Sequence, residues 1–324
     1  MIDLGKWAFG HSKLVYFLLA VLLVGGLKSA YDMGKLEDPE VKVKIAMVVG
    51  VRPGASAHEM ELEVTDPLEK ATAERILSIR RWSEKLFSVN VSRSPAFRFT
   101  PGQWVRLGIP SGSGLPGSVI WRPYSMVSAD YDEYLEFFSI LVPGGAFSSR
   151  LAAAGVGDTL YVEKLPYGYL TAARFTGGRH LWLLASGTGV APYLSILRDP
   201  DVWQRYDERV LAYCVSQARD LAYRDELAAL ANDELLGAGR PPLRFVPIVT
   251  RESVPGALQA RLPALIADGS LERAAGLALT PEDSRILVCG NPQMLDDVRD
   301  ALFARGLRPD RSAVPGHFAT ENYW

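Results

Sequence analysis

The stretch HLWLLASGTGVAPYLSIL, residues 180–197, decides the fold of the second half of this chain. An apolar run at 180–185 indicates a buried strand, a glycine-rich turn follows at 186–189, and Pro192 stands where a helix begins. Proline suits that position because the first helical turn leaves its N–H groups unpaired. The free amides and the dipole at such a helix start favour phosphate. The stretch therefore predicts a strand–turn–helix unit that holds a nucleotide.

Strands and helices alternate from this unit towards the end of the chain. The further strands are predicted over 209–215, 243–250 and 285–290, and the helices over 220–231, 260–269 and 291–306. Such alternation predicts a parallel sheet with right-handed crossovers, whose ligands bind at the carboxyl ends of the strands. The residues that fall at those ends are Gly187, Ser216, Arg251 and Cys289.

Two arginines and two cysteines in this half have more than one interpretation. Arg251 follows a predicted strand and Arg261 lies ten residues further on. Two guanidinium groups near a strand end suit a 2′-phosphate and so favour NADP over NAD, although two solvated surface arginines give the same pattern. Cys289 is either a small core residue or a neighbour of a ligand, whereas Cys214 lies mid-strand and indicates core.

The region from Ala73 onwards has a different residue pattern. Short segments rich in β-branched and aromatic residues, separated by turn residues, predict a small antiparallel barrel; they are ERILSIRRW, KLFSVNVSR, QWVRLGIP, YLEFFSILV and DTLYVEKLP. After a predicted strand, Arg122 can fork onto a pyrophosphate, Tyr124 can stack on a flat heterocycle and Ser125 can reach a ring nitrogen. In PGGAFSSRL, residues 143–151, the glycines permit close approach and the following amides can bind phosphate.

The composition narrows the function classes. The chain has 324 residues, is 48% hydrophobic and 22% charged, and carries a formal net charge of −2. These values exclude a wholly disordered chain and give no support to a nucleic-acid binder. Its two cysteines cannot build an iron–sulfur or zinc site by themselves, so we expect no metal.

From about residue 72 to 324 the chain resembles bacterial ferredoxin/flavodoxin–NADP reductases. The resemblance is carried by RPYS (122–125), GxxS (145–148), SGTGVAP (186–192), VTRE (249–252), GALQARLPALI (256–266), VCGNPQM (288–294) and GHFATENYW (316–324). It implies an α+β two-domain reductase. An antiparallel six-stranded Greek-key barrel that binds FAD is expected over 73–173, and a parallel-sheet α/β domain that binds NADP over 174–324.

The resemblance also implies roles for single residues. FAD is expected to contact Arg122, Tyr124, Ser125, Val142, Gly145, Phe147, Ser148, Tyr323 and Trp324, and NADP(H) to contact Thr188, Gly189, Ser216, Arg251 and Arg261. The expected catalytic residues are Ser125 near the reactive flavin nitrogen, Cys289 beside the nicotinamide and Glu321 as a proton relay. One departure is Ser216, which stands where related reductases often carry a third arginine for the 2′-phosphate.

The implied activity is electron transfer between NADP(H) and a one-electron carrier, ferredoxin or flavodoxin, by hydride transfer to the flavin. The reductase component of an oxygenase and a free-flavin reductase are the alternative enzymes. We expect a monomer with an acidic protein partner. Candidate contacts for that partner are Arg80, Arg81, Arg93, Arg98 and Arg106, which a scattered solvated face explains equally well.

The first 72 residues do not match the rest. The uncharged run LVYFLLAVLLVGGL (14–27) is short for a membrane span, and with its flanks it predicts a candidate transmembrane helix over 13–30, with a core helix or a leader as alternatives. A short strand–helix extension follows. Residues 7–71, notably EDPEVKVKIAMVVGVRPGASAHEMELEVTDPLEKA, resemble the start of a resistance-nodulation-division efflux pump. A membrane-anchored, transport-related fragment is therefore the alternative from another class. We expect a cytoplasmic protein, with a candidate tether to the inner membrane.

Overall fold

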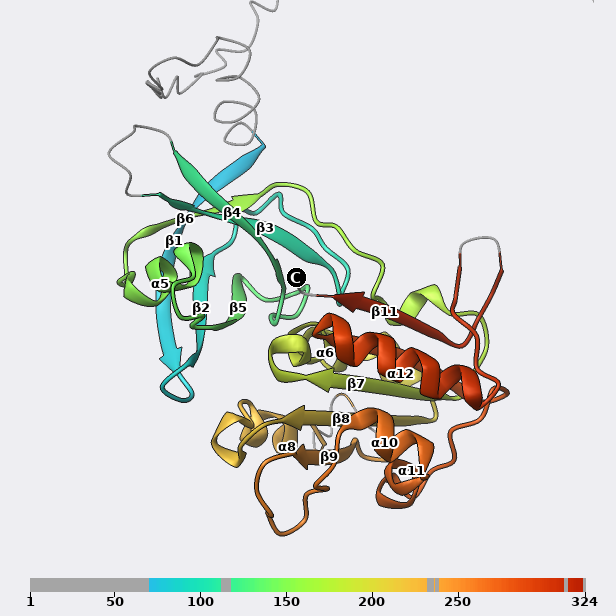
Figure 1. Cartoon of the computed structure of the whole chain (residues 1–324). Coiled ribbons are helices and arrows are strands. Elements are labelled where there is room, and N and C mark those ends of the chain that lie inside the picture. Colours follow the sequence, from blue (N-terminus) through green and yellow to red (C-terminus); the bar gives the residue numbers. More distant parts are fainter. Residues whose placement is uncertain (1–69, 112–117, 232–235, 237–238, 312–313, 323–324) are drawn as a thin grey trace, which may run out of the picture. The chain divides into compact units, whose positions relative to one another are not determined.

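The computed structural model describes residues 70–111, 118–231, 236, 239–311 and 314–322 (Figure 1). All of them belong to one compact unit, Val49–Trp324. The apolar helix predicted over 13–30 and the pump-like segment up to residue 69 lie outside the described residues. Within the described ranges, no helix is both long enough and apolar enough to cross a membrane.

Six antiparallel strands form the first sheet, in the order β4-β3-β6-β1-β2-β5. They are β1 (Ala71–Arg81), β2 (Leu86–Ser92), β3 (Trp104–Pro110), β4 (Val119–Ser125), β5 (Tyr134–Ile140) and β6 (Thr159–Glu163). Alternate residues of a strand point to the same face, so Phe87, Val89 and Val91 of β2 enter one buried core. The helix α5 (Ala146–Ala153) packs Phe147 and Leu151 into that core.

This first sheet is a half-barrel. Its two edges are β4 and β5, and the isolated bridge between Met126 and Phe137 joins the chain just beyond β4 to β5. The six antiparallel strands predicted for this region are confirmed.

Five parallel strands form the second sheet, in the order β11-β10-β7-β8-β9. They are β7 (His180–Ser186), β8 (Glu208–Val215), β9 (Arg244–Val249), β10 (Ser284–Gly290) and β11 (Phe318–Asn322). The predicted parallel sheet is confirmed. Strand β11 was not predicted, because it is a short edge strand whose residues Thr320, Glu321 and Asn322 break any apolar pattern.

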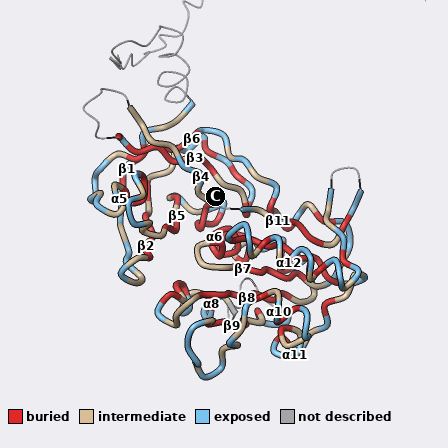
Figure 2. The backbone as a smooth tube through the Cα atoms, in the orientation of Figure 1, coloured by how far each residue is buried: buried red, intermediate tan, exposed pale blue. Residues whose placement is uncertain are grey.

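Helices cover both faces of the parallel sheet (Figure 1). Leu181 and Leu183 of β7 face α6 (Ala191–Leu197), α7 (Pro200–Arg205) and α8 (Arg224–Ala231). Trp182 and Leu184, the residues between, face α10 (Leu262–Ala267), α11 (Ser270–Ala275) and α12 (Pro292–Ala304). Because both faces are buried, β7 is an unbroken apolar run, and the strands form the buried layer in Figure 2.

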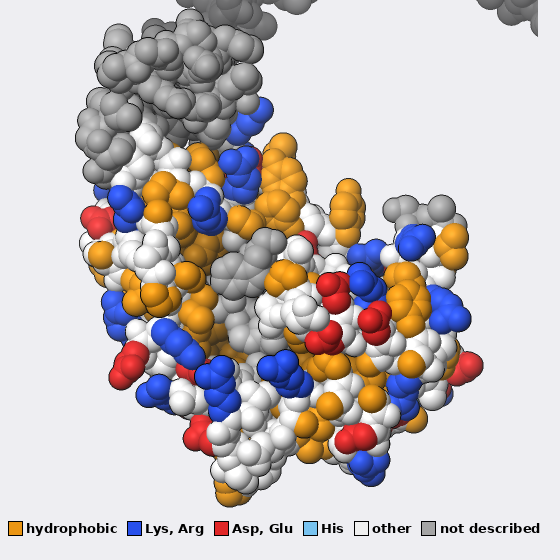
Figure 3. Space-filling view, viewed as in Figure 1, with side chains coloured by type: hydrophobic (Ala, Val, Ile, Leu, Met, Phe, Trp, Pro, Cys, Tyr) orange, Lys and Arg blue, Asp and Glu red, His pale blue; other side chains and the backbone are white. Residues whose placement is uncertain are grey.

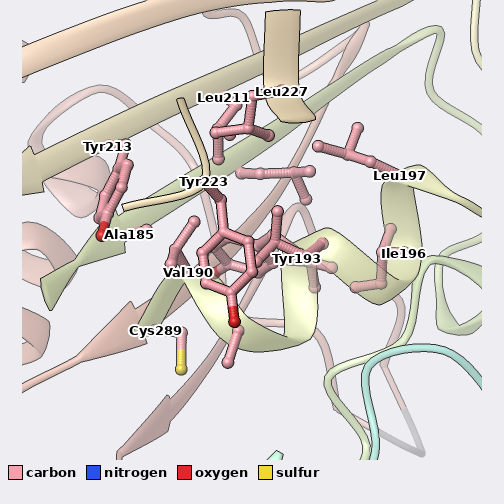
Figure 4. Close-up of a cluster of buried hydrophobic side chains, with 14 of the residues drawn as sticks. Ala185, Val190, Tyr193, Ile196, Leu197, Leu211, Tyr213, Tyr223, Leu227 and Cys289 are labelled. Atoms are coloured by element: carbon pink, nitrogen blue, oxygen red, sulfur yellow. The ribbon is translucent and has the colours of Figure 1, made fainter. Parts of the chain in front are cut away.

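The cluster drawn in Figure 4 shows how one of these faces is filled. Tyr193, Ile196 and Leu197 of α6 pack with Ala185 of β7 and Leu211 of β8, and all five side chains are buried. Full burial of each leucine or isoleucine side chain contributes about 1.5–3 kcal/mol, so this contact fixes the glycine-rich turn that precedes α6 against the sheet.

The prediction of a helix over 220–231 is wrong for the first residues of that range. A short 3₁₀ turn covers Ala218–Asp220, and α8 begins only at Arg224. Tyr223 has φ = 60°, a left-handed backbone that ends any helix passing through it. Its hydroxyl donates to Glu136 Oε1 of β5 at 2.7 Å and its ring lies 4.2 Å from that of Trp82. The interruption therefore lets Tyr223 join the half-barrel to the parallel sheet.

Candidate functional site

A cavity of about 540 Å³ opens at the carboxyl edge of the parallel sheet. Its lining includes Gly187 and Thr188 after β7, Ser216 after β8 and Arg251 after β9. The residues predicted to gather at these strand ends do so, except for Cys289, which is fully buried beneath the cavity edge at 0% exposure. Cys214, predicted as core, packs in the core and also lines the cavity.

Positive charge without a counter-ion lies on one side of this cavity. Arg251 and Arg261 both line it, and neither guanidinium makes an ion pair or hydrogen bond within the described part of the chain. The backbone N–H of Arg251 donates to the Ser216 carbonyl at 3.0 Å, which fixes these two residues side by side. Unpaired arginines in a concave site suit a phosphate ligand, because a guanidinium forks onto phosphate oxygens. The predicted trio of Ser216, Arg251 and Arg261 is therefore assembled here.

Part of the cavity lining comes from the half-barrel. Lys85, Leu86 and Ile140 line the cavity together with the residues of the parallel sheet. Leu86 and Ile140 pair directly in the β2–β5 ladder, so this wall has a rigid backbone. Sequence reasoning missed all three residues, since they belong to no motif and only the tertiary fold brings them to the nucleotide side.

The glycine-rich turn is pressed against β10. A Cβ added to Gly189 would lie 2.3 Å from the Cys289 carbonyl oxygen, so only glycine permits this approach. Gly189 and Cys289, each predicted to lie near the nicotinamide, are thus in contact. Burial raises the pKa of the Cys289 thiol well above its ordinary value, so the thiol stays protonated and behaves as a small apolar side chain.

The prediction that the Arg122–Ser125 motif follows a strand is wrong. Arg122, Tyr124 and Ser125 belong to the last four residues of β4 itself. The strand tolerates Pro123 because β4 is an edge of its sheet, where one side of the backbone needs no ladder hydrogen bond. The Tyr124 ring lies 5.4 Å from the Phe147 ring, and its hydroxyl pairs with Ser139 Oγ at 2.9 Å. Burial raises the pKa of Tyr124, which keeps the phenol neutral. Arg122 is exposed and Ser125 is buried.

The second predicted motif folds into a tight cradle. The Val142 N–H donates to Ser148 Oγ at 3.1 Å, and the Gly145 N–H donates to the Val142 carbonyl at 2.9 Å. A Cβ at Gly145 would lie 2.7 Å from Ser148 Oγ, so the turn requires glycine there. Phe147 links this cradle to Tyr124, so the two motifs are adjacent. These residues fit a flavin nucleotide, with a stacking ring and a phosphate-sized turn side by side.

Trp104 connects the three residues predicted to be catalytic. It pairs with Ser125 in the β3–β4 ladder, its indole and the Glu321 carboxyl group both lie beside Gly168, and Glu321 pairs with Cys289 in the β10–β11 ladder. Sequence reasoning missed Trp104, which was one aromatic residue in a predicted strand. Glu321 Oε2 is shielded from solvent and has no hydrogen-bond partner within the described residues. A buried, half-satisfied carboxyl group is suited to holding a proton.

Burial raises the pKa of Glu321 from 4.5 to about 7, against the opposing effects of Trp104 and Arg174, which lower it. The unfolded chain therefore gives up a proton between these values that the folded protein retains. The stability that Glu321 contributes is fully present below pH 4.5 and is lost as the pH rises through 7, by up to about 3 kcal/mol.

We accordingly expect Glu321→Gln to unfold at a higher urea concentration than the wild type at pH 8, with the difference vanishing near pH 5. Urea midpoints of the FAD-loaded protein from pH 5 to pH 8 measure this. Glu84→Gln, which removes an exposed carboxylate on the β1–β2 loop, is the matched control. A difference between E321Q and wild type that does not change with pH would contradict the expectation.

The arginines considered for partner contact are largely engaged elsewhere. Arg80 pairs with Glu226, and Arg81 donates to the Ala152 carbonyl. Arg93 donates to the Asp130 and Asp132 carbonyls, and Arg98 donates to the Pro95 carbonyl of its own loop. Figure 3 shows Lys and Arg side chains spread over the visible face and mixed with Asp and Glu. Tyr323 and Trp324, predicted to cover the flavin, lie outside the described residues.

Comparisons with known proteins agree with this geometry. Residues 183–300 match the family model for an oxidoreductase NAD-binding domain. The ferredoxin–NADP reductase A of Sorangium cellulosum is 41% identical over 253 residues, which cover 77% of this chain and 89% of that protein. The flavodoxin/ferredoxin–NADP reductase of Escherichia coli is 35% identical over 251 residues, covering 77% of this chain and 97% of that protein.

A solved structure is similar over the same region. The ferredoxin NADP⁺ reductase from Neisseria gonorrhoeae, with bound FAD and NADP, is 39% identical and superimposes with a TM-score of 0.73. The match covers 79% of this chain and 99% of that one. The resemblance of the N-terminal segment to an efflux pump stays a prediction.

Proposed function

This chain belongs to the bacterial ferredoxin/flavodoxin–NADP reductase family, and we propose that it uses FAD to move electrons between NADP(H) and a small one-electron carrier protein. The observation that carries the proposal is the cavity with unpaired Arg251 and Arg261 on one side and the half-barrel on the other. Such a cavity can bring a phosphorylated nucleotide and a flavin together, and proximity of the reacting rings accounts for much of the rate of such reactions.

On the flavin side, FAD when bound supplies the redox chemistry, accepting a hydride from NADPH and releasing electrons one at a time. Tyr124 provides a neutral aromatic face. Arg122 is exposed, and one guanidinium nitrogen donates to the Trp121 carbonyl at 2.7 Å, which leaves its other N–H groups for a pyrophosphate. The cradle of Val142, Gly145 and Ser148 offers a tight turn for the same phosphates. Ser125, as the family resemblance implies, would place its hydroxyl near the reactive ring nitrogen.

On the nicotinamide side, Arg251 and Arg261 bind the 2′-phosphate, with Ser216 as an uncharged donor. Thr188 and Gly189 would lie between the flavin and the nicotinamide nucleotide, and Cys289, buried behind the turn, keeps Gly189 close to β10. Glu321 holds a proton near neutral pH, close to Ser125 and Cys289 through Trp104. A flavin-covering role for Tyr323 and Trp324 stays a prediction, because these residues lie outside the described ranges.

The partner is an acidic ferredoxin or flavodoxin, since reductases named for both carriers are similar to this chain over almost their full lengths. We propose that the reductase part acts as a monomer in the cytoplasm, where NADPH is available.

Steady-state assays test this function. The purified full chain, loaded with FAD, is expected to reduce ferredoxin or flavodoxin with NADPH, and added salt is expected to slow the reaction because complementary charges steer the encounter. Faster reduction of free FMN than of either carrier would favour a free-flavin reductase. Reduction that requires an oxygenase partner would favour an oxygenase component, and a colourless protein found only in membranes would favour the transport-related alternative.

A further inference from the structure

Lys85 is the residue of the half-barrel that brings positive charge to the nucleotide cavity. It lies at the end of the β1–β2 loop, and its side chain, 42% exposed, lines the cavity with Arg251 and Arg261. Those arginines come from the parallel-sheet half, so Lys85 is the cation that the half-barrel adds to the lining.

The backbone around Lys85 is held rigidly. Its carbonyl accepts from the Leu141 N–H at 2.7 Å, beyond the end of β5. On the other side of the loop, Ser83 Oγ accepts from the Leu86 N–H at 3.3 Å. The backbone from which the side chain starts is therefore held by two strands of the half-barrel.

Asp220 holds the Lys85 ammonium in place. Lys85 Nζ lies 2.7 Å from Asp220 Oδ2, and the Asp220 side chain is only 5% exposed. Ser83 Oγ lies 3.5 Å from Asp220 Oδ1. An ammonium has three N–H donors. Within the described ranges, Asp220 is the one partner of the Lys85 ammonium. Two donors stay available on a side chain that faces the cavity.

Lys85 decides the sign of the formal charge of the cavity lining. Its lining holds the cations Lys85, Arg251 and Arg261 and the carboxylates Asp220 and Asp297. Without Lys85 the formal charge of the lining would be zero, and the nearly buried Asp220 carboxylate would repel an anionic ligand. Ser216, on the strand end next to Arg251, brings no charge of its own.

Building on the proposed function, we propose that Lys85 directly binds a phosphate group of the nicotinamide coenzyme, with Asp220 as the anchor that orients its ammonium. Coenzyme binding then engages both halves of the molecule, because the half-barrel supplies one cation and the parallel sheet the other two. An ammonium can bind either the 2′-phosphate or the pyrophosphate of the coenzyme. Comparing NADP⁺ with NAD⁺, which lacks the 2′-phosphate, shows which of the two Lys85 binds.

Calorimetric titration of the FAD-loaded full chain with NADP⁺ and NAD⁺ tests the proposal without relying on turnover. Lys85→Met keeps the aliphatic stem, and we expect it to raise the Kd of NADP⁺ about tenfold, as for the loss of a hydrogen bond to a charged group. Lys85→Arg is expected to retain most of the affinity. If K85M weakens only NADP⁺, the contact is with the 2′-phosphate, and if it weakens both nucleotides, the contact is with the pyrophosphate.

The double variant Lys85→Met with Asp220→Asn separates direct binding from mere neutralisation. It restores the formal charge of the cavity but not the ammonium, so we expect its NADP⁺ affinity to stay well below that of the wild type. Arg80→Met is the control. Arg80 belongs to the same β1–β2 hairpin as Lys85 and makes an ion pair with Glu226, but it does not line the cavity. Thermal melts of every variant verify folding.

Three results overturn the proposal: wild-type affinity in K85M, wild-type affinity in the double variant, or equal weakening in R80M and K85M. In each case a wild type that binds NADP⁺ leaves the proposed function standing. A folded wild type that binds no NADP⁺ at all would overturn the function and this inference together.

Discussion

Removing both Arg251 and Arg261 is expected to raise the KM for NADPH by about 10²–10⁴-fold while leaving the reaction with NADH nearly unchanged. Each guanidinium lines the cavity without a protein counter-ion, so the 2′-phosphate is its expected partner. A hydrogen bond between charged groups contributes about 1.5–3 kcal/mol, and two such residues account for a change of this size. Steady-state kinetics with both coenzymes measure the preference for NADPH over NADH.

The single variants Arg251→Ala and Arg261→Ala are expected to show smaller losses, each with the preference for NADPH reduced. Arg299→Ala is the matched control, because Arg299 is an arginine of α12 that pairs with Asp296 and does not line the cavity. An unchanged preference for NADPH in the double variant, or an equal rise of KM for NADH, would show that these arginines do not bind the 2′-phosphate.

Gly189→Ala is expected to lower the rate of flavin reduction by NADPH about 100-fold. The added methyl group would lie 2.3 Å from the Cys289 carbonyl oxygen and 2.6 Å from its carbonyl carbon, both backbone atoms that cannot turn aside. The turn must then move away from β10 and carry Thr188 with it. A displacement of about 1 Å in a site that aligns two reacting groups can cost this much in rate.

Rapid mixing of the variant with NADPH measures this rate, and thermal melts measure the accompanying loss of stability, about 1–3 kcal/mol for an overpacked site. Gly155→Ala is the control, since its new methyl group would meet only Asp158 Oδ2 at 3.7 Å, an ordinary contact. Wild-type rates in G189A would mean that the close approach of the turn to β10 has no part in aligning the coenzyme.

The sequence predicts the layers of this protein well, because each layer follows from a local pattern. The apolar runs of β7 and β10 have both faces covered, and such strands are easily recognised. The glycine-rich turn and Pro192 mark the start of α6. The two flavin motifs are adjacent, although the first lies within β4 and not after it.

What the sequence misses depends on contacts between distant segments. Lys85 is an ordinary polar loop residue until the fold places it 2.7 Å from Asp220. Trp104 is one of several strand aromatics until β11 brings Glu321 to its indole. Tyr223 sits in a helical pattern, and no local propensity predicts its left-handed backbone or its contacts with Glu136 and Trp82.

The central claim is that FAD and NADPH meet in one site formed by the half-barrel and the parallel sheet. Anaerobic titration of the FAD-loaded protein with NADPH tests it most directly, with absorbance at the flavin band as the readout and dithionite as the chemical control. We predict that NADPH bleaches the bound flavin in proportion to the amount added. A flavin that dithionite bleaches and excess NADPH leaves unchanged would contradict the account.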